Sequence, residues 1–439
     1  MPPVIPYSST LNGAIMTTLD TEVIIVGGGL AGLACAKNLH AQGIKFLLLE
    51  AENRVGGRIK TDKQNGYLLD RGFQVLQTAY PEASRAFDYS GLDLQPFAPG
   101  VKIRIGRQFH TVADPLRKPQ KMLQTLRAPI GTLGDRLRLV RLAGQVRSVP
   151  LEALFQEKET TTIDFLREQG FSETMINRFF VPFFGGACLD RQIRASSRVF
   201  KYILRMFAAG DAALPKKGME QLPSQLAQGL PAETIQASTR VSRIDKGLVT
   251  LENNTSLSAR AVVVATEGPE TQRLLGLSPQ GGSVGETCFY FSSDKEAWHT
   301  PFLMLNGTGK GPINNIAIPS MVSSEYAPPG KSLISVVALD NLGNEPEHLL
   351  SAVNTQLVEW YGDTAKQWEH LATYTINYAL PEQLPPTVDP TRTDPRHTDG
   401  IFVCGEHSSL PAIQWALYSG RQAAESIGHY LQEERKSTD

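Results

Sequence analysis

The feature that most constrains this chain is a strand, a glycine turn, a helix and a second strand that follow one another near its start. Residues 22–26 form a β-branched run typical of a buried parallel strand, and glycines at 27–29 end it. The apolar spacing over 30–40 predicts a helix, and a second apolar strand at 46–49 ends in Glu50. Two parallel strands joined by a helix form a right-handed βαβ unit, so the sequence predicts an α/β fold with a parallel sheet.

The glycines of this turn have the spacing G-x-G-x-x-G, at Gly27, Gly29 and Gly32. Gly27 allows the tight turn, Gly29 lets the backbone approach a pyrophosphate, and Gly32 lets the helix pack closely on the sheet. The free N–H groups at the helix start favour phosphate, and Glu50 stands where a carboxylate accepts from ribose hydroxyls. The unit therefore predicts a dinucleotide site. Its predicted contact residues are Gly27, Gly29, Leu30, Ala31, Gly32, Glu50 and Ala51.

Four further stretches carry a resemblance to a known family. They are Asn-Arg-Val-Gly-Gly-Arg at 53–58, Asp-Arg-Gly-Phe at 70–73, Phe-Val-Cys-Gly-Glu at 402–406 and Ala-Leu-Tyr-Ser-Gly-Arg-Gln-Ala-Ala at 416–424. With the glycine turn, they resemble the flavin-containing amine oxidase superfamily, which includes phytoene desaturases and protoporphyrinogen oxidase. The resemblance covers nearly the whole chain. It implies an FAD-dependent oxidoreductase with a Rossmann-type FAD-binding domain and a discontinuous α+β substrate domain of mixed sheet and helices.

The resemblance also implies roles for individual residues. Gly57 and Arg58 would lie along the pyrophosphate, where the guanidinium can meet a phosphate in a bidentate way. The 70–73 stretch would pass beside the flavin ring, and the backbone of Val241 would meet adenine. For Arg58 and Arg71, each taken alone, a surface salt bridge is the alternative. The further cofactor-binding residues implied are Gly57, Arg58, Asp70, Arg71, Gly72, Phe73, Val241, Gly405, Glu406, Ala412 and Ile413.

We expect the FAD to be bound non-covalently. Covalent members of the family use a cysteine well before the final glycine–acid motif, whereas Cys404 directly precedes Gly405 and is better explained as a small buried residue. His407 follows the motif and is the candidate catalytic base, with a structural hydrogen bond to backbone as the alternative. No metal site is predicted, because the four cysteines are scattered without a Cys-x-x-Cys pair.

Two regions bear on the substrate. Amine oxidases of the family often carry an aromatic just before the last helix, where this chain has Ala412, and this counts against an amine. Residues 179–186 resemble the substrate domain of the desaturase and protoporphyrinogen oxidase branches, and their aromatics either line a pocket or pack in the core. We therefore expect hydride removal from a C–H bond of a small hydrophobic, isoprenoid- or tetrapyrrole-like substrate, with O2 or a quinone as electron acceptor. The alternatives are an amine or amino-acid oxidase, a non-enzymatic prenyl-binding escort-like protein and a redox-neutral isomerase.

Charge is balanced over the whole chain and concentrated in one segment. Lys and Arg number 43 against 44 Asp and Glu, a net charge of −1 that argues against nucleic acid as a partner. Residues 115–150 hold eight basic residues and one acid, with Leu133, Leu137 and Val140 on one helical face. This segment either contacts an anionic membrane surface or forms an ordinary solvated helix. The sparse cysteines suit a reducing compartment, so we expect a cytoplasmic protein that contacts a membrane peripherally if the first alternative holds.

Capping signals predict helices in the middle of the chain, and the family resemblance implies a discontinuous domain division. Thr161 with Asp164 predicts one capped helix, and Ser172 predicts another that Pro182 closes. The predicted segments are a flexible tail at 1–19, an FAD-binding domain at 20–105, 215–280 and 385–439, and a substrate domain at 106–214 and 281–384.

Overall fold

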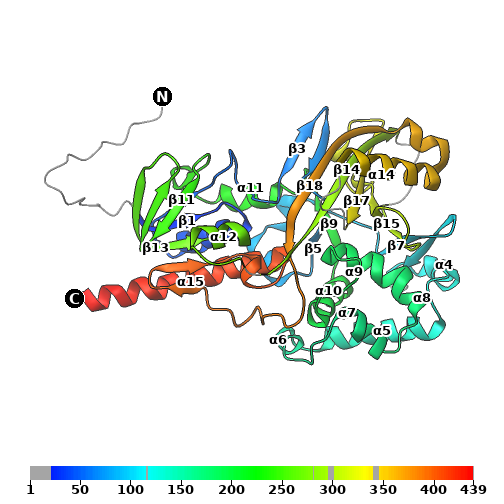
Figure 1. The fold of residues 1–439 in the computed structure, drawn as a ribbon, viewed down its shortest axis with the longest axis horizontal. Helices are drawn as coiled ribbons and strands as arrows, with labels where there is room; N and C mark the ends of the chain where they lie inside the picture. Colours follow the sequence, from blue (N-terminus) through cyan, green and yellow to red (C-terminus); the bar gives the residue numbers. More distant parts are fainter. Residues whose placement is uncertain (1–20, 115–116, 280, 295–300, 340–345, 439) are drawn as a thin grey trace.

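The computed structural model describes residues 21–114, 117–279, 281–294, 301–339 and 346–438. This part of the chain consists of two large β-sheets and a group of helices. In Figure 1 the first sheet lies at the left with α12 and α15, the second sheet at the upper right, and the helices α4 to α10 below it. The predicted combination of mixed sheets and helices is confirmed. The predicted tail at 1–19 lies outside the described residues.

The first sheet is built on the predicted βαβ unit. β1 (Thr21–Val26) pairs in parallel with β2 (Phe46–Leu49) on one side and with β13 (Ser256–Val264) on the other. Ile24 and Ile25 have no exposed surface, as expected for a parallel strand covered on both faces. The remaining five of its eight strands are β10 (Ile235–Gln236), β11 (Val241–Asp245), β12 (Leu248–Leu251), β19 (Arg396–Thr398) and β20 (Ile401–Val403).

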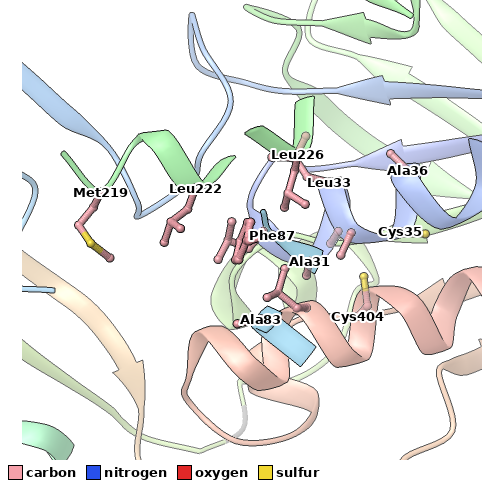
Figure 2. Packing of buried hydrophobic residues seen from close by; sticks show 14 of the residues in the cluster. Ala31, Leu33, Cys35, Ala36, Ala83, Phe87, Met219, Leu222, Leu226 and Cys404 are labelled. Carbon is pink, nitrogen blue, oxygen red and sulfur yellow. The ribbon is translucent and has the colours of Figure 1, made fainter. Parts of the chain in front are cut away.

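Helix α1 (Leu30–Ala41) links β1 to β2 and packs against α15 (Ile413–Thr438) and α11 (Gln221–Gln228). Figure 2 shows Leu33 of α1 and Leu222 of α11 within one buried apolar cluster. Because the sheet and these helices bury apolar surface on both sides of β1, the glycine turn between β1 and α1 is held on a rigid support.

The second sheet has seven strands in the order β18-β14-β17-β16-β15-β7-β8. β14 (Ser283–Asp294) lies antiparallel between β18 (Glu369–Pro381) and β17 (Lys331–Leu339). Helix α14 (Pro346–Tyr361) packs on this sheet (Figure 1). β7 belongs to the second sheet, although the predicted division placed residues up to 105 in the FAD-binding domain. The other strands are β7 (Gly100–Ile105), β8 (Gln108–Ala113), β15 (Leu303–Asn306) and β16 (Ile313–Ala317).

Two small antiparallel sheets and short helices connect these layers. In one of the small sheets β3 pairs with β4, and in the other β9 lies between β5 and β6. Their bounds are β3 (Thr61–Gln64), β4 (Tyr67–Asp70), β5 (Leu76–Gln77), β6 (Leu94–Pro96), β9 (Ala212–Pro215), α2 (Pro81–Ala86), α3 (Tyr89–Leu92), α12 (Gly268–Leu274) and α13 (Pro319–Val322).

A group of helices covers one end of the second sheet (Figure 1). The predicted caps are confirmed in this group: the hydroxyl of Thr161 accepts from the Asp164 N–H at the start of α7, and that of Ser172 accepts from the Met175 N–H at the start of α8. Its α-helices are α4 (Met122–Arg127), α5 (Leu133–Ser148), α6 (Leu151–Leu154), α7 (Thr162–Glu168), α8 (Glu173–Met175), α9 (Val181–Cys188) and α10 (Ser197–Ala209).

The predicted helix end at Pro182 is wrong. A π-helical turn, Ile176–Phe180, follows α8 and leads directly into α9. Proline lacks an N–H donor and is tolerated in the first turn of an α-helix, where that donor has no intrahelical partner. The change from π-helical to α-helical bonding places Pro182 in such a first turn, so the chain continues through it.

Candidate cofactor and substrate cavity

A cavity of about 1410 Å³ lies between the first sheet, the second sheet and the helices. The loops that follow β1, β2, β13 and β20 line one end of it, and side chains of α4, α5, α9 and α10 line the other. All four loops leave the carboxyl ends of parallel strands, which is where open α/β sheets bind their ligands. The cavity therefore joins a dinucleotide-type site to a largely apolar chamber.

The glycine turn between β1 and α1 fits a pyrophosphate. A side chain on Gly32 would place its Cβ 2.0 Å from the Gly27 carbonyl oxygen, so Gly32 serves close packing and does not line the cavity. Gly29 lines the cavity, and a Cβ there would meet nothing within 4 Å. α1 also has no side-chain cap at Gly29, which leaves the N–H groups of Leu30 and Ala31 for a ligand. A phosphate would fill the space that this missing side chain leaves.

Glu50 is fixed by backbone hydrogen bonds at the end of β2. One carboxylate oxygen accepts from the Gly28 N–H at 2.8 Å, and the other accepts from the Glu52 N–H at 2.8 Å. Ala51 and Val241 also line the cavity. A bound FAD would meet the Glu50 carboxylate with its ribose hydroxyls and the Val241 backbone with its adenine, as the sequence resemblance implies.

Arg58 and Glu406 form an ion pair at the cavity wall. Nη1 of Arg58 also donates to the carbonyl of Ala379, and the guanidinium lies 5.6 Å from the centre of the Tyr378 ring. Burial raises the pKa of the Glu406 carboxyl despite the attraction of Arg58. The Arg58 side chain is 32% exposed, so its other N–H groups remain available to a phosphate. Gly57 and Gly405, which neighbour this pair, also line the cavity.

Asp70 has a structural position instead of facing a ligand. Its carboxylate accepts from the Thr61 hydroxyl at 2.5 Å, the Met219 N–H at 3.0 Å and the Tyr326 hydroxyl at 2.8 Å, and it does not line the cavity. Burial raises the pKa of Asp70 to about 6 although these hydrogen bonds oppose the rise. Asp70 thus anchors the segment that follows it.

The rest of that segment divides between the surface and the cavity. Arg71 lines the cavity edge and pairs with Asp62 at 3.1 Å and with Glu52 at 3.4 Å. Arg71 thus forms the salt bridge that the sequence offered as an alternative to a contact with the cofactor. Phe73 lines the cavity, whereas Gly72 does not. Gly72 has φ +92°, which favours glycine and turns the chain toward Phe73.

His407, Ala412 and Ile413 line the cavity at the start of α15. Burial and, to a smaller extent, the positive charge of Arg58 lower the pKa of His407 to about 4, so the imidazole is neutral at pH 7. Its Nε2 is buried and has no hydrogen-bond partner among the described residues. This nitrogen is therefore open to a ligand.

Both interpretations of the aromatic stretch hold, for different residues. Phe180 is fully buried in the core of the helical group. Phe179 and Phe183 line the cavity and stack with ring centres 5.7 Å apart, and Phe183 also lies 4.8 Å from the Phe207 ring. Phe180 thus points into the core, whereas Phe179, Phe183 and Phe207 of α10 face the cavity.

Unpartnered polar atoms around the cavity support a polar ligand. Both amide atoms of Gln77, the Oε1 of Gln74 and the hydroxyl of Tyr202 are buried without a hydrogen-bond partner in the described chain, and all three residues line the cavity. Such atoms cost about 1–3 kcal/mol each when left unpaired. A flavin ring carries polar nitrogens and carbonyls that could pair with them, so the residues present fit this group.

The sequence analysis missed several of these lining residues. Thr266 and Glu267 directly follow β13, and the rule that ligands bind at the carboxyl ends of parallel strands could have found them. Gln74 and Gln77 follow the Asp-Arg-Gly-Phe stretch closely and could have been included with it. Glu286 lies inside a strand and carried no signal, because only the packing of the two sheets brings it to the cavity.

The part of the chain that the structure describes carries no candidate metal centre and no candidate membrane-spanning helix. Within these ranges, no group of three or more His, Cys, Asp or Glu side chains is placed to hold a metal ion. Among the helices that the structure describes, none has the length and apolarity to cross a bilayer.

Residues 30–428 match the family model of flavin containing amine oxidoreductases, and the chain belongs to this family. Family membership implies a flavin cofactor, which agrees with the glycine turn, Glu50 and the unpartnered atoms of the cavity. The sequence resemblance is thereby confirmed.

Individual relatives and solved structures are more distant. The chain is 29% identical over 257 residues to human lysine-specific histone demethylase 2, covering 56% of this chain and 30% of that protein. It is 39% identical over 71 residues to protoporphyrinogen oxidase 2 of Arabidopsis thaliana, covering 16% and 14%. Its fold is similar to cyclohexylamine oxidase from Brevibacterium oxydans (TM-score 0.69, 16% identity, covering 94% of this chain and 100% of that one). A putative protoporphyrinogen oxidase from Exiguobacterium gives a TM-score of 0.70 at 16% identity, covering 94% and 99%. The matched segments thus span less than a third of the first two proteins, and the structural matches describe the fold.

Proposed function

We propose that this protein is an FAD-dependent oxidoreductase that removes a hydride from a C–H bond of a hydrophobic, isoprenoid- or tetrapyrrole-like substrate. One observation carries the proposal: a single cavity runs from the glycine turn to the aromatic side chains Phe179, Phe183 and Phe207. Bound flavin supplies a hydride acceptor. The aromatic and aliphatic walls would orient a flat or extended apolar molecule and exclude water from the reacting bond.

The FAD in this proposal is held without a covalent bond. Cys404 is fully buried and does not line the cavity. Cys188 does line it, but burial raises the pKa of its thiol to about 12, so the reactive thiolate is scarce at neutral pH. Release of the intact cofactor on unfolding in acid would support this, and a flavin that stays with the chain would overturn it.

Anaerobic bleaching of the flavin absorbance tests the substrate class. We expect a lipid-pigment extract or porphyrinogens to bleach it and an amine pool to leave it unchanged. Phe183→Ala should slow bleaching about tenfold or more, equivalent to 1.4 kcal/mol of lost substrate contact. Phe109→Ala is the matched control, because Phe109 packs on Trp360 and Tyr361 and does not line the cavity.

Each contrary outcome selects one alternative. Bleaching by amines alone would establish an amine or amino-acid oxidase. A protein that cannot be reconstituted with FAD would indicate an escort-like carrier. A product of unchanged mass and altered geometry would indicate isomerisation. Reoxidation by air or by an added quinone would separate the two proposed electron acceptors.

We also propose a cytoplasmic location with peripheral membrane contact through α4 and α5. Six of the nine large apolar side chains that are exposed among the described residues lie on these two helices, and five of the six also line the cavity. Basic side chains such as Lys121, Arg138 and Arg141 lie on the same segment, which suits anionic headgroups. The six are Met122, Leu123, Leu126, Leu133, Leu137 and Val140, which we call the α4–α5 patch.

Vesicle flotation tests this contact. We expect the protein to bind vesicles of phosphatidylcholine with phosphatidylserine, and the triple serine variant of Leu133, Leu137 and Val140 to lose binding. The matched control is the triple serine variant of three exposed apolar residues outside the patch. These are Leu277, Leu384 and Val388. Equal binding by both triple variants would support the solvated-helix alternative.

A further inference from the structure

Glu286 is a buried acid that no sequence pattern and no part of the proposed cofactor site accounts for. It lies on β14 of the second sheet, is 7% exposed and lines the cavity. One of its carboxylate oxygens accepts from the Phe73 N–H at 3.0 Å. Among the described residues, no cation forms an ion pair with it.

The position of Glu286 follows from the period of two along β14. Tyr290 and Ser292 share its face, and both contact the 67–73 segment. The Tyr290 hydroxyl donates to the Asp70 carbonyl at 2.8 Å, and the Ser292 hydroxyl lies 2.6 Å from the Tyr67 hydroxyl. β14 therefore runs along the 67–73 segment, with Glu286 at the Phe73 end. Of the three, Glu286 alone lines the cavity.

At this end of β14, three neighbouring residues line the cavity. Phe73 belongs to the segment that follows the glycine loops, and Ile376 is the β18 residue paired with Glu286. A cofactor anchored at the glycine turn and a substrate in the aromatic chamber would approach each other beside these residues. Glu286 is the carboxyl available there, since Glu406 is paired with Arg58.

Charged and titratable groups on the packed elements are engaged elsewhere. Asp70 is held by Thr61, Met219 and Tyr326, as described above, and the Tyr374 hydroxyl donates to Asp62. Cys288 lies 3.3 Å from the Ser335 hydroxyl, and β17 places the apolar Leu339 opposite Glu286. Two further side chains near Glu286 are also engaged. Arg71 pairs with Asp62 and Glu52, and Tyr290 is bonded to the Asp70 carbonyl.

We propose that Glu286 is the proton acceptor for substrate oxidation. When a C–H bond is lost as hydride, its electron pair leaves the substrate for the flavin. The substrate becomes neutral when an adjacent N–H or C–H bond also breaks and releases a proton. The electron pair of that second bond then forms the new C=N or C=C bond. Glu286 takes this proton on its carboxylate and becomes a neutral acid.

The electrostatics of the site support this role. Burial raises the pKa of Glu286 to about 7, although the Phe73 hydrogen bond opposes the rise. A base with a pKa near the working pH is both ionised often enough and basic enough to accept a proton. The inference rests on the proposed hydride transfer, and it adds the residue that removes the accompanying proton.

Glu286→Gln is the decisive variant, because glutamine keeps the shape and an acceptor for the Phe73 N–H but cannot take up a proton. We expect the anaerobic reduction rate of the wild type to fall as the pH drops below about 7, and that of the variant to be about 100-fold lower or more without this inflection. Glu82→Gln is the matched control, because Glu82 is equally buried, pairs with Arg421 and does not line the cavity.

A second readout does not depend on turnover. Difference infrared spectra should show a protonated carboxyl band that titrates near pH 7 in the wild type and the Glu82→Gln variant and is missing from Glu286→Gln.

The free energy of unfolding should also depend on the protonation of Glu286. The folded pKa lies above the unfolded one, so the wild type loses stability relative to Glu286→Gln as pH rises from about 4.5 to 7.

The outcomes separate this inference from the proposed function. If candidate substrates bleach the wild type and Glu286→Gln equally, with the same pH profile, Glu286 is not the proton acceptor and the proposed function stands. If no candidate substrate bleaches a flavin that dithionite reduces, the proposed function fails and the proton-acceptor role fails with it. A wild type without a titrating carboxyl band near neutral pH would also overturn the inference.

Discussion

The two ends of the cavity are built from different kinds of structure. At the nucleotide end, short loops leave parallel strands and present backbone N–H groups, glycines and one carboxylate to the cavity. At the substrate end, side chains from four helices and from the second sheet form a largely apolar wall. The first end recognises a fixed chemical group through local backbone geometry, and the second depends on which side chains the packing of distant segments brings together.

This difference predicts different responses to substitution. A change at the nucleotide end meets backbone atoms that cannot move, so the effect depends on the space at each position. A change at the substrate end meets flexible side chains, so we expect smaller effects on stability and larger effects on substrate choice.

The pair Gly32→Ala and Gly29→Ala tests the nucleotide end most severely. At Gly32 the new Cβ meets the Gly27 carbonyl oxygen at 2.0 Å, and we expect a loss of about 3 kcal/mol or more in the free energy of unfolding. At Gly29 the backbone (φ −73°, ψ −178°) accepts alanine and the Cβ enters open space. We therefore expect a stability change within about 0.5 kcal/mol and FAD binding weakened about tenfold or more. Urea unfolding of the apoprotein measures the change in stability, and flavin fluorescence titration measures FAD binding. If Gly29→Ala binds FAD as tightly as the wild type, no phosphate occupies this space.

Arg58→Met tests the ion pair between the glycine loops and β20. Removing the guanidinium leaves the Glu406 carboxyl buried and unpaired, and we expect a loss of about 2–3 kcal/mol. The double variant with Glu406→Gln should recover most of this stability, because it removes the buried charge as well, while FAD binding stays weak. Chemical denaturation of both variants checks this, and equal stability of the single and double variants would contradict it.

Asp135→Asn tests the substrate end, where Asp135 joins α5 to the start of α8. Its carboxylate accepts from the Ser172 N–H at 2.8 Å and from the Thr132 N–H at 2.7 Å. Burial favours the neutral acid, but the hydrogen bonds from Ser172 and Thr132 outweigh it and hold the pKa of Asp135 at about 2. Against the ordinary value of 3.8, this difference is worth about 2 kcal/mol at neutral pH.

The pH dependence gives the sign of that effect. Because the folded pKa lies below the unfolded one, the stabilisation is present above about pH 4 and is lost as the pH falls toward 2. The stability difference between wild type and Asp135→Asn should therefore shrink in acid, as measured by urea unfolding at several pH values. Asp363→Asn, whose carboxylate is 89% exposed, is the control. A difference that does not change with pH would show that the carboxylate's charge has no part in it.

The signals that predict the nucleotide end are local. Gly27, Gly29 and Glu50 lie within one βαβ unit, and a strand followed by a glycine turn and a helix has one geometry. Asp70 was assigned to the cofactor but lies in a buried network with Met219 and Tyr326, which are far away in the sequence. The sequence placed the segment correctly and left the direction of its side chains open.

By itself, then, the sequence determined the fold class, the family and which loops line the nucleotide end of the cavity, because each depends on residues that are neighbours in the chain. Tertiary structure decided what the sequence left open. It divided the phenylalanines of the π-helical turn between core and cavity, and it brought Glu286 against Phe73 from 213 residues away. The physical reason is that a strand or helix fixes only its own period, whereas the face that meets a ligand depends on which other surface packs against it.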